Sequence, residues 1–170
     1  MIKAIVYTSN TGTTKKYAQL ISKNTGLACY SLDKAKTELV KGGEIIYLGW
    51  IMAGGIKEFK TANKLFKVVA VCGVGMGKTG TQLDDVKSKN NIDSDVALFT
   101  LQGGFDISKL KGIYRFMMNT MAKTAGKKLA EKTDRTEDED DMLDMMQNGG
   151  NRVSEENLKS FFEWYNSVAK

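Results

Sequence analysis

Short apolar runs, separated by amphipathic stretches, recur along residues 1–101. Five runs of about six residues have the composition of strands that are buried on both faces of a sheet, at 2–7, 27–32, 44–49, 67–72 and 96–101. Helical stretches lie between most of them, the first at 13–23. Parallel strands need such crossovers, and right-handed crossovers put helices on both faces. The pattern predicts a doubly wound α/β fold with a five-stranded parallel sheet in the order 2-1-3-4-5.

Three polar or glycine-rich loops follow the first, third and fourth predicted strands. In a sheet of this order those strands flank the switch point, and ligands bind beyond the carboxyl ends of the strands there. We therefore expect a ligand site formed by these three loops.

The last third of the chain is predicted to be helical. Residues 107–129 form a long basic amphipathic helix with one apolar face: Ile107, Leu110, Tyr114, Met117, Met118, Met121 and Ala125. Thr136 can cap a short helix in the acidic segment 131–150, and Ser154 can cap a final helix over 154–169. With neither an internal repeat nor a dividing linker, residues 1–170 are predicted to form a single domain.

Composition excludes several classes of protein. The chain has no histidine, so it cannot build a Ser-His or Cys-His pair or an imidazole zinc site, and hydrolases become poor candidates. Cys29 and Cys72 lie in predicted strands, where buried reduced thiols are expected. No run approaches the roughly 18 apolar residues of a membrane span, and the N-terminus reads as a strand instead of a signal sequence. We expect a cytoplasmic protein.

Charge is divided unevenly along the chain. Residues 1–130 carry 20 basic and 9 acidic residues, a net charge of +11, whereas residues 131–170 carry 5 and 11, a net charge of −6. A basic body is compatible with nucleic acid, an anionic membrane or an acidic partner. The acidic run Glu137-Asp138-Glu139-Asp140-Asp141 is typical of a solvated segment.

The first loop has the chemistry of a phosphate site. A phosphate can be held by backbone N–H groups, hydroxyls and a helix N-terminus without basic side chains. Gly12 allows the backbone to turn closely, and a helix is predicted to begin at Thr13. The alternative is an ordinary turn that only caps this helix. The candidate phosphate-binding residues are Thr8, Ser9, Asn10, Thr11, Gly12, Thr13 and Thr14.

This loop resembles that of the flavodoxin family, which reads Ser/Thr-x-Thr-Gly-Asn-Thr after an apolar strand, whereas this chain reads Ser9-Asn10-Thr11-Gly12-Thr13-Thr14. Thr13 replaces the usual asparagine and keeps a backbone N–H and a hydroxyl. The resemblance implies a flavodoxin-like fold that binds flavin mononucleotide (FMN), with the loops after strands three and four around the flavin ring. It makes these residues candidates for the ring site: Trp50, Ile51, Met52, Ala53, Gly54, Gly55, Gly73, Val74, Gly75, Met76 and Gly77.

Within the ring loops, Trp50 either stacks on the flavin or fills the core beside its loop, with Met52 and Met76 as softer alternatives. Flavodoxins usually surround the reduced, anionic flavin with carboxylates. Residues 49–57 and 72–80 contain none and contribute Lys57 and Lys78. The sequence therefore predicts a less negative potential for full reduction.

A competing nucleotide-binding motif overlaps the fourth strand. Residues 72–79 approach the P-loop pattern G-x-x-x-x-G-K-[ST], but Cys72 replaces its first glycine. Lys78 likewise breaks a G-x-G-x-x-G dinucleotide fingerprint. We therefore disfavour both a P-loop NTPase and a dinucleotide-binding protein.

The rest of the chain is similar to a flavodoxin subgroup with Gly103-Gly104-Phe105-Asp106 after the last strand. It also resembles the menaquinone-dependent protoporphyrinogen dehydrogenases, through Tyr114-Arg115-Phe116-Met117. The first resemblance implies an electron carrier that exchanges electrons with protein partners. The positive net charge of residues 1–130 would suit an acidic partner. The second implies a porphyrinogen-oxidising enzyme in which 107–129 contacts a quinone or the membrane surface.

We favour the carrier because nothing in the sequence defines a substrate pocket. A non-redox basic binding module is the remaining alternative. Aromatic residues do not interleave with basic ones on any predicted strand face, so nucleic acid is not an expected partner.

Overall fold

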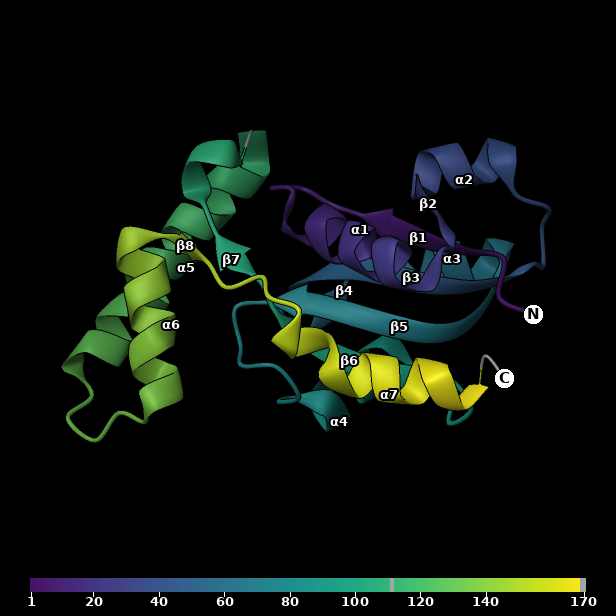
Figure 1. Cartoon of the computed structure of the whole chain (residues 1–170). Helices are drawn as coiled ribbons and strands as arrows, with labels where there is room; N and C mark the ends of the chain where they lie inside the picture. The colour runs from purple at the N-terminus through teal and green to yellow at the C-terminus, as the bar shows by residue number, and fades with distance from the viewer. Residues whose placement is uncertain (111, 169–170) are drawn as a thin grey trace.

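A five-stranded parallel sheet forms the centre of the computed structural model, which describes residues 1–110 and 112–168 (Figure 1). The strands lie in the order β2-β1-β3-β5-β6, and the short strand β4 pairs antiparallel with β3. With β4 set aside, this is the predicted order 2-1-3-4-5. The strands are β1 Ala4–Thr8, β2 Ala28–Ser31, β3 Glu44–Met52, β4 Gly55–Ile56, β5 Lys67–Gly75 and β6 Ala97–Gln102.

Helices cover both faces of the sheet, as predicted. On one face α1 (Thr13–Thr25) and α7 (Lys159–Val168) pack around Ile5, Ile46 and Cys72, with Tyr17 and Phe161 fully buried. The other face carries three helices: α2 Leu32–Glu38, α3 Phe59–Leu65 and α4 Leu83–Asn90. Burial of apolar side chains on both faces is the main stabilising contribution to such a fold.

A pair of helices stands at one end of the sheet instead of covering it. This pair consists of α5 (Gly112–Glu131) and α6 (Glu137–Asn148), and Figure 1 shows it at the left, away from the sheet faces. A two-stranded ladder, β7 (Gly104–Phe105) with β8 (Gly150–Asn151), ties the pair to the rest of the chain. We call α5 and α6 the helical hairpin.

The boundaries predicted in this part of the chain need correction. Instead of one helix over 107–129, the chain forms a 3-10 turn at Ile107–Lys109 and then α5, which begins at Gly112. Lys111 and the side chain of Ile107 lie outside the described residues. The predicted apolar face is also divided, because Met117 is 42% exposed while Tyr114 and Met118 face a cavity.

The acidic segment contains a helix, as the capping residue predicted. Thr136 accepts a hydrogen bond from the backbone N–H of Glu139, and the Glu139 carboxylate accepts one from the backbone N–H of Thr136. This reciprocal capping box satisfies two otherwise free donors. The final helix starts with a 3-10 turn, Glu156–Leu158, next to Ser154, whose hydroxyl accepts from Asn157 N–H. Residue 169, the predicted end of this helix, lies outside the described residues.

The register of the sheet brings the ends of four strands together. Thr8 pairs with Gly49, Gly49 with Gly73, and Gly73 with Thr100, so one row of residues crosses β1, β3, β5 and β6. The chain leaves each of these strands within a few residues of this row. The loops that carry the predicted site therefore meet at one edge of the sheet.

Asn90 fixes the β3–β4 turn at this edge. Its side chain is almost fully buried; it accepts from the N–H of Ile56 (2.7 Å) and donates to the carbonyl oxygens of Gly54 (2.9 Å) and Val86 (2.7 Å). The turn itself, Ala53-Gly54, has positive φ at both residues (48° and 78°), the geometry of the tight turns that join antiparallel strands. One amide side chain thus joins α4 to the turn.

Replacing Asn90 by alanine is expected to lower the free energy of unfolding by about 1–2 kcal/mol, because the Ile56 N–H and the carbonyl oxygens of Gly54 and Val86 each lose a partner. Urea unfolding measures this loss, and hydrogen exchange of the Ile56 amide locates it. Asn24→Ala is the matched control, since Asn24 also donates to the carbonyl oxygen four residues earlier (2.9 Å) but is exposed. Equal effects of the two substitutions would contradict the role of Asn90.

Candidate functional site

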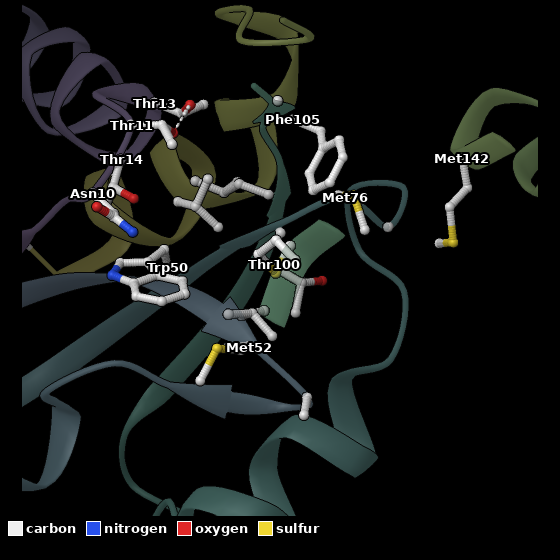
Figure 2. A pocket seen from close by; sticks show the side chains of 18 of the residues that line it. Asn10, Thr11, Thr13, Thr14, Trp50, Met52, Met76, Thr100, Phe105 and Met142 are labelled. Carbon is white, nitrogen blue, oxygen red and sulfur yellow. Dashed lines mark hydrogen bonds between the residues drawn. The ribbon is translucent and has the colours of Figure 1, made fainter. Parts of the chain in front are cut away.

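A cavity of about 260 Å³ opens at the carboxyl ends of the strands (Figure 2). Its walls come from the first loop, the β3–β4 turn, the end of β5 and the end of β6, and its roof comes from the helical hairpin. This is the position at which doubly wound sheets bind ligands. The sequence predicted the position from the order of the strands.

One end of the cavity is polar. Asn10, Thr11, Thr13 and Thr14 line it, and the hydroxyls of Thr11 and Thr13 lie 3.2 Å apart. Gly12 has a φ of +96°, a left-handed conformation that glycine adopts without steric cost.

Helix α1 presents free donors at this end. No side chain caps its N-terminus, and its first intrahelical bond runs from Lys16 N–H to the Gly12 carbonyl oxygen (3.0 Å). In the part of the chain that the structure describes, the first-turn N–H groups at 13–15 have no backbone or side-chain acceptor. Free N–H groups, the helix dipole and hydroxyls together form an anion-binding end.

Three residues of the predicted phosphate loop lie outside the cavity lining. Thr8 turns toward Tyr47, whose hydroxyl lies 2.8 Å from the Thr8 hydroxyl and donates to the Lys57 carbonyl oxygen (2.7 Å). Ser9 accepts a hydrogen bond from Gly12 N–H (3.2 Å) and so shapes the loop from within. Gly12 contributes its backbone turn. Four of the seven predicted residues therefore line the cavity.

The other end of the cavity is apolar. Trp50, Ile51, Met52, Ala53 and Gly54 line it from the β3–β4 turn. From the end of β5, four further predicted residues face it: Val74, Gly75, Met76 and Gly77.

The remaining two ring-loop candidates, Gly55 and Gly73, do not line the cavity. A Cβ on Gly73 would lie 2.7 Å from Ile51 Cδ1. The glycine therefore leaves room for a neighbouring side chain of the wall. Gly55 begins β4, one residue beyond the lining part of the turn.

Trp50 lines the cavity and does not fill the core. Figure 2 shows its ring between Asn10 and Met52, where the polar part of the lining meets the apolar part. The Trp50 ring meets Tyr114 of α5 edge to face, with centroids 5.6 Å apart. Such aromatic pairs contribute about 0.5–1.5 kcal/mol beyond the area they bury. The contact joins the β3–β4 turn to the helical hairpin.

The roof of the cavity is rich in methionine. Tyr114, Met118 and Met121 reach it from α5, and Met142 from α6. Together with Met52 and Met76, five of the nine methionines of the chain line this cavity. Methionine is flexible and polarisable, so such a surface adapts to the shape of an apolar ligand.

Polar contacts hold α6 against the end of β6. The Asp141 carboxylate accepts from the side chains of Gln102 (2.6 Å) and Arg152 (2.9 Å), and Asp144 pairs with Arg152 at 3.1 Å. Asp138, one turn earlier, pairs with Lys78 at 3.2 Å. The acidic run is therefore a contact surface of the helical hairpin rather than only a solvated segment.

These ion pairs change the charge expected at the cavity. Lys78 lines the cavity but is paired with Asp138, a residue about 60 positions away in the chain. Asp106 also lines it, and hydrogen bonds from Ser108 and Lys109 lower the pKa of this carboxyl, so it stays ionised. Later segments therefore bring carboxylates to the cavity that the two ring loops lack. Lys57, the other cation of these loops, lies outside the lining, with its ammonium 5.5 Å from the ring centroid of Tyr114.

Further lining residues were missed among the site residues predicted from the sequence: Lys78, Thr81, Gln82, Thr100, Leu101, Gly104, Phe105, Asp106, Leu110, Tyr114, Met118, Met121 and Met142. Those after β6 could have been found, because every parallel strand near the switch point ends at the same edge. The roof residues could not, because helical periodicity does not show against which part of the fold a helix packs.

The structure does not support the P-loop alternative. Residues 72–75 belong to β5, and α4 begins only at Leu83, so no helix follows the Gly-Lys-Thr sequence directly. Thr79 instead accepts a hydrogen bond from Gln102 N–H (2.9 Å).

Both cysteines lie in strands and are free, as predicted. Cys72 is buried, which raises the pKa of its thiol, and Cys29 is half-buried. Within residues 1–110 and 112–168, no group of side chains has the composition of a metal site, and no helix has the length and hydropathy to cross a membrane.

Comparison with known proteins gives one match. The model of a protein family described as a flavodoxin domain matches residues 4–133, from the first strand to just beyond the end of α5. No curated protein and no solved structure matches the chain.

Proposed function

The chain belongs to the flavodoxin family, and from this premise we propose that it binds FMN and carries electrons between protein partners. Flavodoxin domains typically bind this cofactor. The observation that supports the proposal is the uncapped N-terminus of α1, which opens onto the polar end of a cavity with an apolar far end.

The cavity lining changes from polar to apolar, as the phosphate and the ring of FMN require. Its phosphate would be held at the polar end by the hydroxyls of Thr11 and Thr13 and by the free N–H groups of α1. Its flat ring would lie against Trp50, Met52 and Met76 at the apolar end. Bound FMN supplies reversible uptake of one or two electrons.

Electron transfer without a catalytic side chain agrees with the charges of the cavity. Lys78 and Asp106 are its charged lining residues in the part of the chain that the structure describes. Lys78 is paired with Asp138 (3.2 Å) and Asp106 with Lys109 (3.1 Å). Neither side chain is a free acid or base for proton transfer. A carrier needs no such group.

Titration of the purified protein with FMN tests the binding step, with one FMN expected per chain. The FMN-loaded protein is then mixed with a reduced ferredoxin-type protein, and separately with protoporphyrinogen and a menaquinone analogue. Bleaching of the flavin only by the ferredoxin is the expected result. A protein that remains colourless with added FMN would favour a basic binding module.

A second candidate is an FMN-dependent oxidoreductase of the protoporphyrinogen dehydrogenase type. The roof favours it, because Tyr114, Met118, Met121 and Met142 add an apolar surface opposite the ring loops. Such a surface would suit a flat apolar substrate. Turnover of protoporphyrinogen in the same experiment would establish this candidate in place of the carrier.

The Lys78–Asp138 pair allows the effect of nearby charge on the flavin potential to be tested. Asp138→Asn leaves Lys78 without its carboxylate partner, so the net positive charge beside the bound flavin rises and its reduction becomes easier. We expect the flavin potential to rise by tens of millivolts in a redox titration at low salt. Asp33→Asn, which breaks the exposed pair with Lys36 on α2, is the control and should leave the potential unchanged. Equal shifts would show that the pair does not act on the flavin.

A further inference from the structure

A small apolar surface on α5 is open to solvent. Ile113, Phe116 and Met117 are 69%, 72% and 42% exposed. They lie at helical positions i, i+3 and i+4, so they form one patch on the amino-terminal half of the helix. Clustered large apolar side chains on a surface are typical of an interaction site. We call these three residues the α5 patch.

The α5 patch is not a loosely packed part of the core. The neighbouring side of the same helix already carries Tyr114, Met118 and Met121, which face the cavity. Figure 1 shows that α5 stands at the end of the sheet and not over one of its faces. The patch is therefore next to the cavity roof but points out of the molecule.

The helix that carries the α5 patch is basic. From residue 112 to residue 130 the chain carries Arg115, Lys123, Lys127 and Lys128 and no carboxylate. Lys127 pairs with Glu131 at 3.8 Å, and among the described residues the other three cations form no ion pair. Arg115 adjoins the patch, and Lys123, Lys127 and Lys128 extend the positive charge along the same helix. This surface suits a partner with an apolar spot inside an acidic surface.

The roof also restricts how a protein can reach the flavin. A carrier usually exchanges electrons through an exposed flavin edge, but here α5 lies over the apolar end of the cavity. Where Tyr114 lines the cavity, the roof is one helix thick, about 10 Å. Tyr114 contacts Trp50 on the inner side of this helix, with ring centroids 5.6 Å apart, and Ile113, the residue before Tyr114, is exposed on the outer side.

We infer that the α5 patch is the docking surface through which an acidic redox protein exchanges electrons with the FMN of the cavity. The inference rests on the proposed function. In each exchange one electron leaves the reduced partner, which is oxidised, and the bound flavin is reduced by that electron. The apolar residues give the contact its stability, and the basic residues of α5 steer the acidic partner toward it.

A protein suits the α5 patch better than a lipid bilayer. Interfacial helices bury an apolar face that continues along their length. Here the apolar residues end at Met117, and the outward positions that follow include Thr120, Thr124 and Lys127, all exposed.

Phe116→Glu tests the inference, because it places a negative charge at the centre of the patch. Val40→Glu is the matched control, since Val40 is 85% exposed and lies between α2 and β3, away from the cavity. The probe is a reduced acidic [2Fe–2S] ferredoxin, and stopped-flow absorbance at low salt follows its reaction with the FMN-loaded protein. Phe116→Glu should lower the second-order rate constant at least tenfold, and Val40→Glu less than twofold.

Two additional measurements separate the possible failures. Calorimetric binding of the ferredoxin to the protein without FMN should weaken at least tenfold in Phe116→Glu, and this reports on docking even if FMN does not bind. Reduction of the FMN-loaded variants by dithionite should not change, because this small reductant does not need the patch. Failure of wild type to bind FMN would remove the proposed function and with it the electron exchange, whereas the ferredoxin titration would still test the α5 patch as a docking surface.

Equal ferredoxin binding by wild type and Phe116→Glu would overturn the inference. It would also be overturned if Phe116→Glu lost binding to phosphatidylglycerol vesicles while its ferredoxin rate constant stayed at the wild-type value. That result would assign the patch to a membrane surface.

Discussion

Thr11→Val combined with Thr13→Val is expected to weaken FMN binding by about a hundredfold or more. Both hydroxyls line the polar end of the cavity, 3.2 Å apart, where the proposed phosphate lies. A hydrogen bond to a charged group contributes about 1.5–3 kcal/mol, and each 1.4 kcal/mol corresponds to a tenfold change in affinity. Valine keeps the shape of threonine and removes only the hydroxyl. Quenching of flavin fluorescence during titration gives the two dissociation constants.

The control for this pair is Thr37→Val with Thr61→Val. Those hydroxyls donate to the Lys34 carbonyl oxygen and to Glu58, away from the cavity. This double variant should bind FMN as wild type does. If the Thr11/Thr13 variant also binds FMN with unchanged affinity, the phosphate does not lie at the first loop.

Gly49→Ala is expected to cost about 3 kcal/mol of stability, the upper part of the range for overpacking in a filled interior. A Cβ at this position would lie 2.6 Å from Ile56 Cγ2 and 2.7 Å from the Lys57 carbonyl oxygen. The carbonyl oxygen belongs to the backbone beside β4 and cannot rotate away. Urea denaturation should show a lower midpoint with an unchanged m-value.

Gly55→Ala is the control within the same β3–β4 segment. Its nearest contact, the Met52 carbonyl oxygen at 3.4 Å, is at the limit of ordinary van der Waals distance. We expect a change below about 1 kcal/mol. A Gly55→Ala variant as unstable as Gly49→Ala would show that the segment rejects any added methyl group, whatever its contacts.

The order of the sheet was predictable because apolar runs and turn residues are local signals. The strands from Ala4, Glu44 and Lys67 were expected within two residues of their observed starts. The short strands β4, β7 and β8 were not expected, because two-residue ladders have no periodicity to detect. They depend on contacts such as that between Phe105 and Gly150, which are distant in the chain.

The cavity could be predicted only on the side formed by the strand ends. Thr11 and Trp50 follow strands whose ends must meet at one edge, so their proximity was deducible. The opposite side depends on how α5 and α6 pack, and ion pairs between distant residues determine the charge there. Lys57 and Lys78 suggested a cationic site, whereas the pairing of Lys78 with Asp138 appears only once the helical hairpin is in place.

The two segments that connect the helical hairpin to the sheet lie against each other. Arg152 N–H donates to the Gly103 carbonyl oxygen (2.7 Å), and Gly104 pairs with Asn151 in the β7–β8 ladder. The chain thus leaves the sheet and returns to it at nearly the same point. A hairpin of another length or sequence would therefore need no long bridging segment to join this sheet. For protein engineering, this makes the hairpin a point at which the chain can be redesigned while the loops at the carboxyl edge of the sheet stay the same.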